Sequence, residues 1–138
     1  MGVEDILEVY VVRENLEGLA ARHRSQAHLD HLEDVLSRMA RNAEGPPKDL
    51  ADLNIAFHRI IRLAAANGHL NRFLSQVEYA VRRFGCTPFE VPGRAGEALE
   101  EHRHIVEAVA AGDAEAAERL ANEHMRRARE LRIKMLIE

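Results

Sequence analysis

Apolar residues recur along this chain every three or four positions, which is the period of an α-helix with one face turned to a core. No segment alternates apolar and polar residues as a half-buried strand would. The predicted helices cover residues of about 3–22, 25–43, 47–67, 69–84, 95–111 and 113–136. The pattern therefore predicts an all-α protein that forms a single antiparallel bundle of six or seven helices.

The breaks between these segments carry residues that are typical of helix ends. Ser25 is a good N-cap for the second helix. Asn67-Gly68 and Gly112-Asp113 each end one helix and begin the next. Residues 85–93 contain two prolines and have no helical period, so we expect them to form the longest loop and to border a pocket.

Length and composition describe one globular domain over residues 1–138, with 46% hydrophobic and 30% charged residues. Cys86 is the only cysteine, so no internal disulfide can form and a metal site would have to use nitrogen and oxygen ligands. No apolar run approaches the roughly 20 residues of a membrane span, and the N-terminus has no charged leader followed by an apolar stretch. We expect a cytoplasmic protein that does not contact a membrane.

The balance of charges is slightly acidic, with a net charge of −4 and a pI near 6.1. Nucleic-acid phosphates require a clustered excess of Lys and Arg, which is missing here. These residues by themselves are not expected to bind DNA.

Two polar residues interrupt the apolar face of the third predicted helix. Asn54 and His58 are four residues apart, which places their Cβ atoms about 5–6 Å from each other on one side of a helix. An amide or imidazole buried without a partner would cost roughly 1–3 kcal/mol. We therefore expect a ligand or partner that satisfies both groups.

The two last helices repeat this feature. His102 lies in the apolar face of the fifth helix, whereas His104 turns to the opposite side, and His124 lies in the apolar face of the sixth. A single internal histidine is more often a hydrogen-bonded core residue. Three histidines on three helices, with the carbonyl of Asn54 close to one of them, predict a metal site built from inward side chains of a bundle.

Arg13 and Glu17 lie in the apolar face of the first helix, where charged residues are unusual. They could form an internal ion pair, or lie at the edge of the face and extend to water. Alternatively, Arg13 provides a fork for the carboxylate of a ligand.

Four stretches occur in order with separations that are familiar from one protein family. They are Val9-Tyr-Val-Val-Arg-Glu-Asn-Leu-Glu17, Asn54-Ile-Ala-Phe-His58, Glu101-His102-Arg-His-Ile-Val-Glu-Ala-Val-Ala-Ala-Gly-Asp113 and Asn122-Glu-His124. Together they resemble the FCD domain, the ligand-binding domain of FadR-type GntR transcription regulators. The likeness covers nearly the whole chain.

This resemblance implies a bacterial effector-sensing domain that encloses a divalent metal ion, zinc in the first place and nickel or manganese as alternatives. The matching metal ligands are Asn54, His58, His102 and His124, and Arg13 would bind a small organic acid as the effector. It also implies a homodimer. In such regulators a winged helix-turn-helix domain precedes this one and binds DNA, and it is absent from these residues.

The chain departs from the family pattern at Asn54, where an aspartate is usual. A neutral carbonyl still offers a lone pair but no charge, so metal affinity should fall. Asp52 cannot replace it, because it projects about 240° away from His58 around the helix.

Two other functions compete with the sensor. A three-histidine metal site could activate water in a hydrolase, but the sequence has no His-Glu-x-x-His motif that would supply a general base. Glu101 is expected to point about 100° away from His102, which leaves Glu17 as the only carboxylate expected to face inward. The other alternative is a metal-free structural bundle. We expect a regulatory domain and not an enzyme.

Overall fold

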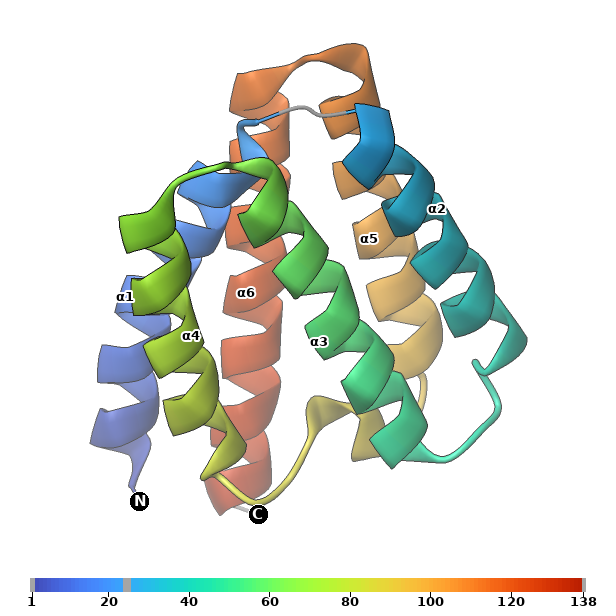
Figure 1. Cartoon of the computed structure of the whole chain (residues 1–138). Helices are drawn as coiled ribbons and strands as arrows, with labels where there is room; N and C mark the ends of the chain where they lie inside the picture. The colour runs from blue at the N-terminus through green and yellow to red at the C-terminus, as the bar shows by residue number, and fades with distance from the viewer. Residues whose placement is uncertain (1, 24–25, 138) are drawn as a thin grey trace.

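The computed structural model (Figure 1) describes residues 2–23 and 26–137. These residues form six α-helices and one short 3-10 helix, with no β-strand among them. The helices are α1 (Val3–Ala21), α2 (Gln26–Arg41), α3 (Pro47–Ala64), α4 (Gly68–Arg82), η1 (Pro88–Glu90), α5 (Arg94–Ala111) and α6 (Ala114–Ile137). The predicted all-α fold is confirmed.

Successive helices run in opposite directions, so the chain forms an up-and-down bundle with both ends of the chain at the same end of the molecule (Figure 1). α6 packs against both α1 and α5, while α3 packs against α2 and α1 packs against α4. No helix in the described part of the chain is long and apolar enough to cross a membrane.

The predicted turns agree with the observed helix ends to within a few residues. The side chain of Asn67 accepts hydrogen bonds from the backbone N–H groups of His69 and Leu70, and Asp113 accepts one from Ala116. The predicted loop contains η1, which sequence periodicity did not indicate. Ser25, the predicted cap of the second helix, lies outside the described residues.

The interior contains two apolar clusters and an unusual number of buried polar groups. The larger cluster is built mainly on α2, α3, α5 and α6, and the smaller one surrounds Ile6, Tyr10 and Val81. The buried polar and charged residues are Glu14, Glu17, His58, Arg62, Arg94, His102, His124 and Arg132. Such groups are rarely buried unless they are paired or bind a ligand, so they define the candidate site.

Candidate metal centre and adjoining cavity

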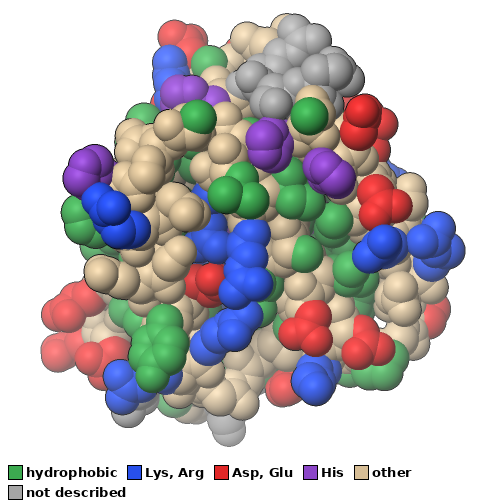
Figure 2. Space-filling model, viewed as in Figure 1, with side chains coloured by type: hydrophobic (Ala, Val, Ile, Leu, Met, Phe, Trp, Pro, Cys, Tyr) green, Lys and Arg blue, Asp and Glu red, His purple; other side chains and the backbone are tan. Residues whose placement is uncertain are grey.

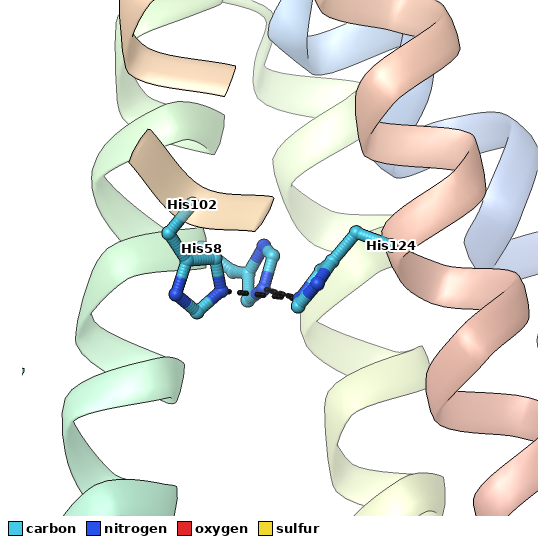
Figure 3. Close-up of side chains that lie close together, drawn as sticks. All are labelled: His58, His102 and His124. Atoms are coloured by element: carbon cyan, nitrogen blue, oxygen red, sulfur yellow. Dashed lines mark hydrogen bonds between the residues drawn. The ribbon is translucent and has the colours of Figure 1, made fainter. Parts of the chain in front are cut away.

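Three histidine rings from three helices meet inside the bundle (Figure 3). His58 comes from α3, His102 from α5 and His124 from α6, and none is more than 5% exposed. Nε2 of His124 lies 3.2 Å from Nε2 of His58 and 3.1 Å from Nε2 of His102. The structure therefore brings together the three histidines that the sequence singled out.

The two spacings to His124 suit a shared metal ion, and ligand nitrogens of all three histidines lie within 4.8 Å of one another. Two imidazoles bound to one ion through bonds of about 2.0–2.1 Å, at tetrahedral to octahedral angles, place their nitrogens about 2.8–3.4 Å apart. The two observed Nε2 separations, 3.1 and 3.2 Å, fall within this range.

The opposite ring nitrogens of two of these histidines face carboxylates. Nδ1 of His124 lies 2.6 Å from Glu101, and Nδ1 of His58 lies 3.0 Å from Glu17, at an angle poorer than that of a full hydrogen bond. Burial raises the pKa of both carboxyls, but the facing histidines and nearby arginines outweigh it and hold each pKa below its usual value. An ionised carboxylate can only accept, so Nδ1 carries the proton in both rings.

With Nδ1 protonated, each Nε2 presents a lone pair, and the lone pairs of His58 and His124 face each other. Two facing lone pairs repel unless a proton or a cation lies between them. Burial lowers the pKa of His124 to about 4, despite the opposing effect of Glu101, and lowers that of His102 well below its usual range. The rings of His102 and His124 are therefore uncharged at neutral pH. Carboxylates that orient histidines in this way are typical of metal sites.

Asn54, the fourth predicted ligand, lies one helical turn before His58 in α3. Its Oδ1 is buried and has no hydrogen-bond partner within residues 2–23 and 26–137. Its side chain lines the same cavity as His124. A buried carbonyl oxygen without a partner is costly, and a metal ion would satisfy it.

A cavity of about 170 Å³ adjoins His124. Asn54 and His124 line it, and residues of the predicted loop, Cys86 to Phe89, form another part of its wall. The prediction that this loop borders a pocket is confirmed. Drug-sized ligands occupy about 300–1,000 Å³, so this cavity suits a ligand of only a few non-hydrogen atoms.

Four arginines line the same cavity. Arg94 pairs with Glu97 and Glu101, and Arg82 faces Glu78, which leaves Arg13 and Arg132. Arg13, predicted from the sequence, is half-buried and donates a hydrogen bond to the Tyr10 hydroxyl at 3.4 Å. Arg132, which sequence reasoning missed, is 8% exposed and donates to the same hydroxyl and to the Cys86 carbonyl, both at 2.7 Å. Because these partners of Arg132 are neutral, its buried charge calls for an anion.

The structure corrects one expectation about the carboxylates. Glu17 is buried beside His58, as expected, but it is not the only inward acid, since Glu14 is also buried. Glu101 does not serve His102 on its own helix. It extends toward α6, where it contacts His124, and its other oxygen lies 2.7 Å from the buried Arg94.

Comparison with known proteins gives the family of this chain. A family model described as the FCD domain matches residues 8–127. The chain belongs to the FCD domain family. The resemblance to the sensing domains of FadR-type GntR regulators is thereby confirmed.

Two curated relatives of this FCD domain are named as transcriptional regulators. The "Probable D-xylose utilization operon transcriptional repressor" of Paenarthrobacter nicotinovorans is 32% identical over 127 residues, which cover 88% of this chain and 55% of the relative. The "HTH-type transcriptional regulator LutR" of Bacillus subtilis (strain 168) is 30% identical over 137 residues, which cover 91% of this chain and 61% of the relative. The chain thus spans little more than half the length of these relatives.

Glu101→Gln is expected to lower the zinc affinity of this FCD domain about tenfold, because a neutral amide holds the Nδ1 proton of His124 less firmly than a carboxylate does. Competition titration with a chromogenic chelator measures the effect. Glu100→Gln is the matched control, since Glu100 is exposed and pairs with Arg103. Equal zinc affinities for the two variants would contradict the role given to Glu101.

Proposed function

We propose that this FCD domain senses a small organic acid with the help of a divalent metal ion, zinc in the first place, bound by Asn54, His58, His102 and His124. The observation that carries the proposal is the meeting of Nε2 lone pairs from separate helices at one buried point. The partnerless Oδ1 of Asn54 supports it.

When bound, the metal would act as a Lewis acid that accepts an oxygen of the effector. The chain itself contributes the remaining recognition. Arg13 and Arg132 bind the carboxylate of the effector, and the size of the cavity excludes larger acids. Glu17 and Glu101 hold the histidine rings in the tautomer that leaves Nε2 free.

The proposed signal passes through α1. This helix carries Arg13, which lines the cavity, and Glu17, which contacts His58. If the effector binds more tightly when α1 is in one position than in another, its binding raises the population of the domain with α1 in that position. We propose that the output is DNA binding by an associated N-terminal winged helix-turn-helix domain, in keeping with the regulator names of the two relatives.

Metal analysis tests the proposal directly. Protein purified without chelators is expected to retain about one divalent ion per chain. Chelated protein is expected to bind zinc with a dissociation constant in the micromolar range or below, which corresponds to a binding free energy of about −8 kcal/mol or stronger. Elemental analysis and calorimetric titration provide these values. A chain that retains no metal and binds no zinc would be the metal-free structural bundle instead.

The competing hydrolase is less well supported by the site. Both carboxylates beside the histidine rings face Nδ1 atoms, so neither is free to act as a general base toward water. We expect zinc-loaded protein to hydrolyse p-nitrophenyl acetate no faster than chelated protein does. Metal-dependent turnover would restore the enzyme hypothesis.

Arg132→Gln is expected to weaken the binding of simple carboxylates, such as glycolate and malonate, about tenfold in zinc-loaded protein, because it removes the buried guanidinium from the cavity wall. Calorimetry with each acid measures the change. Arg126→Gln removes the same charge from an exposed site on α6 and is the control. Unchanged carboxylate affinity in the Arg132 variant would show that the anion binds elsewhere in the cavity.

We further propose that the domain forms a homodimer through α1 and α4. α1 buries Glu14 and Glu17 but exposes Val11 and Val12, which are 54% and 46% exposed. Phe73 of α4 is 54% exposed beside an apolar groove of about 360 Å³ between the two helices. In a two-fold symmetric dimer, the ring of Phe73 of each copy can enter the groove of the other copy, so that both the ring and the groove become buried.

Val12→Glu is expected to convert the dimer to a monomer at micromolar concentrations, because it places a charge in the middle of the apolar surface. Light scattering gives the mass. Leu136→Glu changes an equally exposed leucine at the other end of the sequence and should leave the mass unchanged. A wild-type monomer at all concentrations would remove the dimer proposal.

A further inference from the structure

A polar groove lies on the surface between α3 and α4, outside the metal centre. Its volume is about 440 Å³. Figure 2 shows Lys and Arg side chains gathered between these helices around a small acidic area. The lining residues that matter here are Arg59, Arg62, Leu63, Glu78, Tyr79 and Arg82.

The charges in this groove do not balance. Glu78 contacts Arg59 at 3.2 Å, Arg62 at 3.3 Å and Arg82 at 3.9 Å. Three guanidinium groups therefore share one carboxylate of the groove, while the buried carboxylate of Glu17 acts on Arg62 from the inner side. The groove keeps an excess of positive charge, which an anionic ligand would neutralise.

Arg62 is the only buried side chain of the three. It is only 4% exposed, and its single hydrogen bond to Glu78 is long at 3.3 Å. Its Nε is buried and has no partner among the described residues. A buried guanidinium with unused donors points to an acceptor that the protein itself does not supply.

The groove also has an apolar side. Leu63 is 57% exposed and Tyr79 is 70% exposed, and both line the groove. A ligand that uses the whole groove would combine an anionic group with a carbon skeleton.

We propose that this groove binds a small phosphomonoester, with its dianionic phosphoryl group among Arg59, Arg62 and Arg82 and its organic part against Tyr79 and Leu63. Planar guanidinium groups donate paired hydrogen bonds to phosphoryl oxygens. The groove has the volume of a typical small-molecule site. This groove shares Glu78 and Arg82 with the wall of the inner cavity, but the proposal does not depend on the metal centre.

Arg59 distinguishes the two sites. Glu78 and Arg82 line both the groove and the inner cavity, whereas Arg59 lines the groove and is absent from the cavity wall. A loss of binding on changing Arg59 therefore reports on the groove.

The test is calorimetric titration of chelated wild-type protein with glycerol 3-phosphate, inorganic phosphate and succinate. We expect glycerol 3-phosphate to bind at least about threefold more tightly than inorganic phosphate, because only the ester reaches the apolar side. Arg59→Gln should weaken its binding about fivefold. Glu78→Gln should strengthen it by a similar factor, since it removes the competing carboxylate.

Two further variants make the result decisive. Arg72→Gln removes an exposed arginine of α4 that is outside the groove and should leave the affinity unchanged. His124→Ala, which removes the metal centre, should also bind glycerol 3-phosphate like the wild type. Retained binding in this variant supports the groove, and lost binding assigns the phosphate to the inner cavity instead.

Several outcomes overturn the proposal. One is the absence of saturable glycerol 3-phosphate binding below about 10 mM in both wild type and the Glu78 variant. An equal loss in the Arg59 and Arg72 variants would indicate unspecific charge attraction. Succinate or inorganic phosphate that binds as tightly as glycerol 3-phosphate would overturn the phosphomonoester assignment.

Discussion

Replacing His124 with alanine is expected to lower the zinc affinity of this domain about a hundredfold or more, the largest loss among its single substitutions. His124 is central because its Nε2 is the atom that both other histidine nitrogens approach. Competition with a chelator of known affinity gives the two dissociation constants. His104→Ala is the matched control, since His104 is an exposed histidine of α5 and should change nothing.

The same variant can be tested through stability. A ligand that binds only the folded state adds RT ln(1 + [L]/Kd), which is about 2.7 kcal/mol at a hundredfold excess over Kd. Zinc should therefore raise the melting temperature of wild type and of the His104 variant, but not that of His124→Ala at the same concentration. A similar rise in all three proteins would show that zinc binds elsewhere.

Acid is expected to destabilise the metal-free domain strongly between about pH 6.5 and pH 4. The pKa of His124 falls from its usual 6.5 to about 4 in the folded chain, and that of His102 is also well below its usual range, because burial disfavours the charged ring. As the pH falls below 6.5, His102 and His124 bind protons in the unfolded chain but not in the folded chain. The stability is therefore complete above pH 6.5 and is lost towards pH 4, by about 3 kcal/mol for His124 alone.

Urea unfolding of chelated protein at pH 7.5 and pH 4.5 measures this loss. His124→Ala should lose less stability over the same interval, because it removes one of the two groups that resist protonation in the folded state. His104→Ala should behave like the wild type. An equal loss in all three proteins would show that acid acts through other groups.

The helices and the meeting of the histidines were predictable from sequence because both depend on the period of an α-helix. His58, His102 and His124 each interrupt an apolar face, and such faces meet in the centre of a bundle. Asn54 lies one helical turn before His58, and the structure places it at the cavity wall; its role as a ligand stays a prediction. Arg13 interrupts the apolar face of the first predicted helix, and in the structure it lines the cavity.

Residues that act across the gap between two helices could not be predicted in this way. Glu101 points away from the apolar face of α5, yet this direction leads to His124 on α6. Arg132 resembles the neighbouring arginines of α6 in sequence, and only the positions of Tyr10 and Cys86 show that it is buried. Periodicity describes one helix at a time, whereas these contacts depend on how neighbouring helices are rotated relative to each other.

Asn54 in place of the family's usual aspartate has a consequence for electroneutrality. The charged groups in direct contact with the rings or with their carboxylates are Glu17, Glu101 and Arg94, which together carry one negative charge. A divalent ion would leave this buried centre with one positive charge, which a single carboxylate of a ligand would cancel. An aspartate at position 54 would already cancel it, so in the proposed metal-bound state the neutral amide would leave the last charge to the effector.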